Sequence, residues 1–226
     1  MAIDIEPQAD ALEREVYKEL VWEPSVDALN VDVMGRPNGV IVLTGVVRNY
    51  AEKVTAERAA RRVKGVQSVV NELDVRLASS HERSDVDLAD AVVQALEWDV
   101  LVPPRRIQAR VADGCVRLEG QVDWNYQREA AAEAVHRLAG VKGVTNLIKV
   151  SSQLTVPNVK ALIEAALRRS AELDAQAIDV DVQGRVVMLR GRVQSWAERD
   201  AAETAAWSAP GVTGVLDEIE VAPAEA

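Results

Sequence analysis

The sequence has no phenylalanine, one cysteine and two histidines among its 226 residues. Aromatic residues make up only 4% of a chain that is 48% apolar, so we expect a core of Val, Leu, Ile and Ala. The single Cys115 excludes a disulfide within the chain, and its apolar surroundings favour a small buried side chain. His81 and His136 supply too few ligands for a metal site, so no metal is expected.

The chain also lacks a basic excess and a long apolar run. Lys and Arg number 26 against 36 Asp and Glu, and a net charge of −10 disfavours nucleic-acid binding because it repels phosphate backbones. No apolar run is long enough to form a transmembrane segment. The N-terminal residues show no basic region followed by an apolar stretch, so we expect no secretory signal and a cytoplasmic location.

One short phrase occurs three times in the chain. It reads GVQSVVN at 65–71, GVKGVTN at 140–146 and GVTGVLD at 211–217. A strand-like apolar stretch with a central glycine lies before each phrase, and a helical stripe with i, i+4, i+8 spacing lies before that. The sequence therefore predicts three copies of one small unit.

Each copy is predicted to fold as helix, strand, strand, helix, strand. The first helix is expected over 10–22, 86–98 and 157–170, and glycine-containing turns join the two strands that follow it. The second, alanine-rich helix connects two parallel strands by a crossover. The predicted fold class is α+β, with three tandem αββαβ two-layer modules, each a small mixed three-stranded sheet covered by two helices on one face.

The predicted boundaries follow from these elements. They are 1–8 for an N-terminal tail, 9–78 for repeat 1, 79–84 for a linker, 85–152 for repeat 2, 153–223 for repeat 3 and 224–226 for a C-terminal tail.

Six glycines are assigned structural roles: Gly45, Gly65, Gly120, Gly140, Gly191 and Gly211. The three that open the repeated phrase are expected to end the second helix, because glycine readily adopts a positive φ there. The three in the second strands either allow close packing or a bend, or let a ligand approach bare backbone. Their recurrence in every copy favours the structural interpretation.

The start of the second helix carries a capping signal in two copies. Asn49 and Ser195 each stand three residues before a glutamate, which is the spacing of a capping box. In the second copy, either Asp123 or Asn125 is the expected cap.

The pattern Val-x-Leu-x-Gly-x-Val, followed after a helix by Gly-Val-x-x-Val-x-(Asn/Asp), resembles the BON domain. In this chain it reads VLTGVV…GVQSVVN, RLEGQV…GVKGVTN and MLRGRV…GVTGVLD. The resemblance implies an αββαβ fold, no catalytic activity, and a role in stress response through phospholipid or protein contacts. It also implies a periplasmic location and potassium-ion sensing as alternatives, because the family includes outer-membrane-associated lipoproteins and a potassium-binding protein.

The residues themselves show no catalytic or cofactor-binding motif, so neither an enzyme nor a cofactor is expected. Aromatic and basic side chains form the candidate interaction surface, which consists of Trp22, Trp98, Trp124, Trp196, Arg61, Arg62, Lys64, Arg105 and Arg106. The tryptophans serve either as interfaces or as lids over a small core. The basic residues either meet anionic headgroups or are solvated charges.

Two functions follow from these features. The first is a non-enzymatic bacterial stress-response adaptor that uses its tandem modules to bind protein partners, since repetition raises avidity. The alternative is peripheral binding to anionic phospholipid. Exposed sheet edges further allow self-association.

Overall fold

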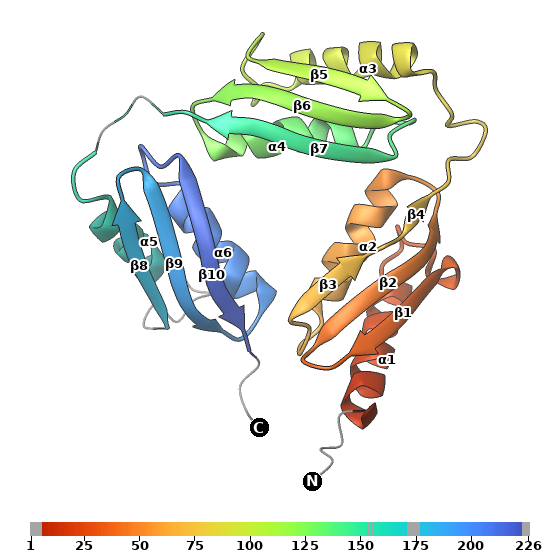
Figure 1. Ribbon diagram of the computed structural model, residues 1–226, viewed down its shortest axis with the longest axis horizontal. Helices are drawn as coiled ribbons and strands as arrows, with labels where there is room; N and C mark the ends of the chain where they lie inside the picture. Colours follow the sequence, from red (N-terminus) through yellow and green to blue (C-terminus); the bar gives the residue numbers. More distant parts are fainter. Residues whose placement is uncertain (1–5, 153, 155, 171–176, 223–226) are drawn as a thin grey trace. The chain divides into compact units, whose positions relative to one another are not determined.

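The computed structural model describes residues 6–152, 154, 156–170 and 177–222, which form three small modules (Figure 1). In each module two helices pack on one face of a small mixed sheet, which confirms the predicted α+β architecture. The predicted tails, 1–8 and 224–226, lie outside the described residues except for 6–8, which belong to the first helix.

The elements of each module follow the predicted order. Module 1 consists of α1 (Glu6–Trp22), a short 3-10 helix η1 (Ala28–Asn30), β1 (Val31–Arg36), β2 (Val40–Val47), α2 (Tyr50–Arg62), β3 (Ser68–Asn71) and β4 (Asp74–Val75). Module 2 consists of α3 (Asp85–Trp98), β5 (Ile107–Ala112), β6 (Cys115–Val122), α4 (Asn125–His136) and β7 (Gly143–Val150). Module 3 consists of α5 (Val159–Arg169), β8 (Ile178–Gln183), β9 (Val186–Val193), α6 (Trp196–Trp207) and β10 (Gly214–Val221).

The sheets share one topology. The first two strands of each module form an antiparallel hairpin, and the second strand lies in the middle of the sheet. In modules 1 and 2 the third strand pairs with the second in parallel, as a crossover through a helix requires. The first and third strands are therefore the two edges of each sheet.

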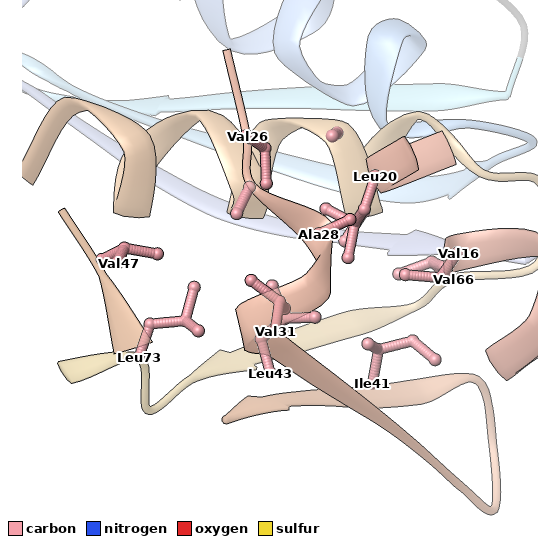
Figure 2. Packing of buried hydrophobic residues seen from close by; sticks show 13 residues of the cluster. Val16, Leu20, Val26, Ala28, Val31, Ile41, Leu43, Val47, Val66 and Leu73 are labelled. Atoms are coloured by element: carbon pink, nitrogen blue, oxygen red, sulfur yellow. The ribbon is translucent and has the colours of Figure 1, made fainter. Parts of the chain in front are cut away.

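The core of module 1 lies between its helices and the covered face of its sheet (Figure 2). Val16 and Leu20 of α1 meet Ile41 and Leu43 of β2, and all four side chains are fully buried. The buried residues of α2 include alanines, whose small side chains let this helix lie close to the sheet. Each buried Val, Leu or Ile contributes roughly 1.5–3 kcal/mol through loss of apolar surface to water, so an aliphatic core suffices without phenylalanine.

The second helices end earlier than predicted. They end at Arg62, His136 and Trp207, three or four residues before the glycine of each repeated phrase. The glycine lies instead in a separate turn: in module 1 the N–H of Val66 donates to the carbonyl of Val63 (3.2 Å), and Gly65 has φ 98°. The prediction that the glycine directly ends the helix was wrong, because this turn adds a step between helix and strand.

The cap of α4 was also predicted wrongly. Trp124, and neither Asp123 nor Asn125, occupies the N-cap position. An indole has no acceptor for the helix amides. The side-chain oxygen of Gln127 compensates by accepting hydrogen bonds from the N–H groups of Asp123 (3.0 Å) and Trp124 (3.1 Å).

Module 1 differs from the others in its third strand, which is divided into β3 and β4. At the break, the N–H of Leu73 donates to Asn71 Oδ1 (3.3 Å) and its carbonyl accepts from Lys53 Nζ (2.7 Å). Side chains thus satisfy both backbone groups of Leu73, whose own side chain is buried. In modules 2 and 3 the corresponding strands, β7 and β10, run without a break.

Candidate functional site

The glycines of the second strands lie opposite the first residue of the preceding strand. Gly45, Gly120 and Gly191 have φ of 114°, 149° and 142°. A Cβ at these positions would lie 2.0–2.2 Å from a carbonyl oxygen of the residue that precedes the neighbouring strand. Packing against the module's own backbone occupies the space that a side chain would need.

The last residue of the repeated phrase has a role that the sequence interpretation missed. Asn71 and Asn146 each donate through Nδ2 to a carbonyl in the first turn of the module's second helix, that of Lys53 and of Arg128, both at 3.0 Å. In module 3 the residue is Asp217, which lacks a donor, and Arg199 Nε reaches across to its carboxylate (2.7 Å). Because the three bonds join equivalent positions, the third strand is fastened to the second helix in every module.

Trp22 and Trp98 hold equivalent positions as the last residues of α1 and α3. Both are strongly exposed, at 82% and 80%. They are therefore not lids over a core, and a large apolar ring in water is available for an interface.

Trp124 and Trp196 are only half-buried and lie elsewhere in their modules, at the start of α4 and α6. Arg199 stacks over the Trp196 ring at 5.0 Å from its centroid, a cation–π contact within module 3. The structure thus separates the four candidate tryptophans into an exposed pair and a half-buried pair.

The loop after α3 carries further exposed apolar residues that were not predicted. Val100 is 96% exposed and Leu101 is 52% exposed, directly after Trp98. The neighbouring Val102 is buried and holds the loop to the module. We call Trp98, Val100 and Leu101 the apolar loop. A run of valine and leucine does not by itself reveal which members face water, so this loop could not be predicted from the sequence.

The candidate basic residues are largely engaged within their own modules. Arg61 pairs with Glu57, and Arg62 pairs with Glu19 (2.8 Å) and Glu23 (3.0 Å) between α2 and α1. Hydrogen bonds from the Ser25 hydroxyl and from Arg62 lower the pKa of Glu23 below its ordinary value. Lys64 is exposed beyond the end of α2.

Arg105 and Arg106 follow the apolar loop in the chain. Arg106 pairs with Asp123 (2.6 Å), so its charge is partly neutralised. Arg105 is exposed and adopts a left-handed conformation with φ 61°. Arg105 and Arg106 are both exposed and close in sequence to the apolar loop, but among the described residues only Arg106 of the two has an ion-pair partner.

The remaining candidate reactive side chains are Cys115, His81 and His136. Cys115 is exposed at the start of β6, so its predicted burial was wrong: its side chain points to the uncovered face of the sheet. His81 is exposed, and His136 Nε2 lies 3.0 Å from Glu133. Within the described ranges, no group of three or more His, Cys, Asp and Glu side chains could hold a metal ion.

No helix among the described residues has the length and apolar character needed to cross a membrane.

Comparison with known proteins places these features in context. The osmotically inducible protein Y of Escherichia coli K12 is 29% identical over 143 residues, which are 62% of this chain and 71% of that protein. The outer membrane lipoprotein DolP of Haemophilus influenzae is 32% identical over 114 residues, 50% of this chain and 58% of that protein. The second match thus spans less than two thirds of the relative.

Among solved structures, two chains of CdsD, a structural protein of the type III secretion system of Chlamydia trachomatis, align at 16% and 15% identity. They cover 95% and 94% of this chain, and 94% and 98% of their own lengths, with TM-scores of 0.27 and 0.25. Values this low carry no structural argument.

The sequence profile of the BON domain matches residues 8–76, 84–152 and 155–223, one match for each module. Together these ranges cover most of the chain. The chain therefore belongs to the BON domain family.

Proposed function

We propose that this protein is a non-enzymatic binding protein of the osmotic or envelope stress response, which attaches peripherally to anionic phospholipid surfaces through module 2. Its likeness to an osmotically inducible protein and to an outer membrane lipoprotein supports the stress and envelope parts of this proposal. The observation that carries the membrane part is the apolar loop of module 2.

The physical basis is transfer of exposed apolar side chains out of water. A large side chain gains roughly 1.5–3 kcal/mol when it is fully buried, so three neighbouring side chains give a useful, reversible affinity even if each is only partly inserted. Trp98 suits the interface, because an indole has an apolar body and a polar N–H. Arg105 adds attraction to anionic headgroups, which salt weakens.

The proposal also includes a location at the cell envelope. Neither relative supports the predicted cytoplasmic location, and the outer membrane lipoprotein favours the envelope alternative. An acidic chain with a net charge of −10 is repelled by an anionic surface as a whole. We therefore propose that binding is local to the apolar loop, with module 2 facing the surface.

Sedimentation with vesicles tests the membrane proposal. The full chain is mixed with phosphatidylglycerol–phosphatidylcholine vesicles or with phosphatidylcholine vesicles, and the bound fraction is measured at low and high salt. The triple variant Trp98→Ser/Val100→Ser/Leu101→Ser should bind the anionic vesicles about 10-fold more weakly, or about 1.4 kcal/mol. The variant Arg105→Glu should lose the preference for anionic vesicles.

The matched control is Trp22→Ser/Leu29→Ser, which removes two exposed apolar side chains of the equivalent loop in module 1. This control should bind within about two-fold of the unmodified chain, because that loop presents polar residues between them. Equal binding by the triple variant and the unmodified chain would refute the assignment to module 2.

The second candidate function is binding of protein partners. It is supported by an open groove in module 1, beside an edge strand of the sheet. The groove and the apolar loop lie on different modules, so the two functions are separable by mutation.

A further inference from the structure

A groove of about 410 Å³ lies between α1 and β1 of module 1. Its apolar wall consists of Tyr17 from the helix and Val31 and Val33 from the strand. Charged residues complete the lining, namely Glu13, Arg14, Lys18 and Asp32. One side of the groove is therefore an edge strand and the other is a helix that presents an aromatic ring.

The direction of the backbone groups of β1 follows from one hydrogen bond. In an antiparallel pair, successive residues direct their N–H and C=O groups alternately toward the partner strand and away from it. The N–H of Gly35 donates to Glu13 Oε2 on α1 (3.2 Å), not to β2. Odd-numbered residues of β1 therefore direct their backbone groups away from β2.

Val33 is consequently the residue whose backbone faces the groove at its middle. The N–H of Val31 is already used by the carbonyl of Ala28, and that of Gly35 by Glu13. Among the hydrogen bonds of the described residues, none engages the N–H or C=O of Val33 on this outer side. A donor and an acceptor thus stand side by side on an open edge, in the arrangement that a neighbouring strand satisfies.

Tyr17 lies on the helical wall and is 40% exposed. Its ring offers an apolar surface in the same groove as the open backbone of Val33. The equivalent residue of module 2 is Val93, and the residue equivalent to Val33 is Ala109. Module 2 therefore has the edge strand without the aromatic wall, which makes it a matched control.

We propose that this groove binds an extended peptide segment of a protein partner, which adds to β1 as a further strand and packs an apolar side chain against Tyr17. This inference rests on the second candidate function, the binding of protein partners. Main-chain hydrogen bonds to Val33 supply affinity for any extended segment, and the Tyr17 wall selects an apolar residue at one position. A folded partner supplies both only if it presents an open edge strand of its own, which is the case of a second copy of the chain.

A displayed library of linear seven-residue peptides supplies the probes. Peptides are selected on the full chain after depletion on the Tyr17→Glu variant, and the enriched peptides are synthesised with a fluorescent label. Their binding is then measured by anisotropy. We expect enriched peptides with an apolar central residue, bound at least 10-fold more weakly by Tyr17→Glu.

The variant Val33→Pro tests the strand pairing directly. Proline removes the N–H that faces the groove, and it leaves the β1–β2 hydrogen bonds in place because Val33 makes none of them. Binding should fall at least 10-fold, while Ala109→Pro, the same change in module 2, should leave it within two-fold. Circular dichroism and the unfolding midpoint report whether each variant stays folded. In the unmodified chain, protection of the Val33 amide from hydrogen exchange when peptide is added reports strand pairing independently.

Three results would overturn the inference. The first is that no peptide is enriched. The second is that enriched peptides bind Val33→Pro as well as they bind the unmodified chain. The third is concentration-dependent dimerisation that Tyr17→Glu abolishes, because the occupant is then a second copy of the chain.

Vesicle sedimentation of Tyr17→Glu and Val33→Pro separates this inference from the membrane proposal. Both variants should bind anionic vesicles as the unmodified chain does. Loss of peptide binding with retained vesicle binding supports the groove, and loss of both in a folded variant contradicts the separation of the two sites.

Discussion

Modules 1 and 2 place a tryptophan at the same point, the last residue of the first helix, but the residues that follow it differ. Trp22 is followed by Glu23, Pro24 and Ser25, whereas Trp98 is followed by Asp99 and the exposed pair of the apolar loop. The scaffold is the same, so exposure of the ring is a property of the fold. The chemistry around the ring is a property of each module.

The same comparison holds for the groove beside the first strand. Module 1 has Tyr17 where module 2 has Val93, and Gly35 where module 2 has Val111. In module 1 an aromatic groove accompanies a loop whose exposed apolar residues, Trp22 and Leu29, are separated by polar ones. In module 2 the apolar loop accompanies a groove without an aromatic wall. We therefore propose that repetition of one fold has produced two surfaces that bind different partners.

The largest expected effect tests what the modules share. Gly45→Val and Gly120→Val each place a side chain within 2.2 Å of a carbonyl oxygen at positive φ, so we expect each to lower the free energy of unfolding of its own module by roughly 3–5 kcal/mol. Hydrogen exchange resolved by module measures the loss. Gly184→Ala is the control, since nothing lies within 4 Å of its Cβ, and it should cost about 1 kcal/mol for the left-handed φ.

The next effect differs between modules 1 and 2 because a different residue of the second helix, Lys53 or Arg128, faces the last residue of the repeated phrase. Asn71→Asp removes the donor to the Lys53 carbonyl, and Lys53 is already bound to Leu73, so we expect a loss of about 1–3 kcal/mol in module 1. Arg128 pairs with the exposed Glu129 (3.0 Å), and such a surface pair is weak. In Asn146→Asp we therefore expect Arg128 to turn toward the new carboxylate, as Arg199 does toward Asp217, and the loss should stay below about 1 kcal/mol. Denaturant unfolding of the full chain compares the two, and equal losses would contradict this distinction.

A loop exchange tests whether the apolar loop is sufficient. Pro24→Val/Ser25→Leu gives module 1 the residues that stand at Val100 and Leu101 in module 2. Made in the background of the triple serine variant, this exchange should restore at least a third of the free energy of vesicle binding that the triple variant loses. The restored binding corresponds to roughly 0.5 kcal/mol or more. If the exchanged chain sediments no better than the triple variant, then module 2 contributes something besides its exposed side chains.

The smallest effect concerns acid stability. The lowered pKa of Glu23 means that its ionised form stabilises module 1 above the ordinary carboxyl pKa, and that this contribution disappears as the pH falls through the lowered value. Arg62→Ala should therefore cost less than about 1 kcal/mol at neutral pH, and this cost should vanish in acid. At the equivalent position of module 2, Arg137 pairs with Glu133 four residues earlier, so among the described residues this arginine does not join the two helices. Unfolding midpoints of Arg62→Ala and of the unmodified chain across the acid range measure the effect, and a cost that persists in acid would contradict it.

The sequence predicted the fold well because the fold depends on repeated local signals. Periodic apolar residues marked the helices and strands, and recurrence at equal spacing identified the modules without any single strong motif. The helix ends were less predictable. The end of α2 at Arg62 could not be placed from the sequence, because Val63 and Lys64 before Gly65 are as compatible with a last helical turn as with the separate turn that they form.

Exposure of the candidate residues could be predicted only in part. Trp22 and Trp98 were singled out because an aromatic residue stands out in a chain without phenylalanine, and both rings are exposed. Val100 and Leu101 were not, because whether an aliphatic residue faces water depends on which neighbour, here Val102, enters the core. The groove could not be predicted either, since it depends on the direction of backbone groups at an edge strand, which side-chain identity does not specify.

The bond that fastens the third strand to the second helix also bears on how the chain folds during synthesis. It joins residues 18 positions apart in each of the three modules. Closing a loop of this size costs little conformational entropy, and contacts of short sequence separation form early. We expect each module to complete itself as soon as its own last strand leaves the ribosome, before the next module exists. Three sequence-related units are then less exposed to exchanging strands with one another, which is the characteristic failure of repeat proteins.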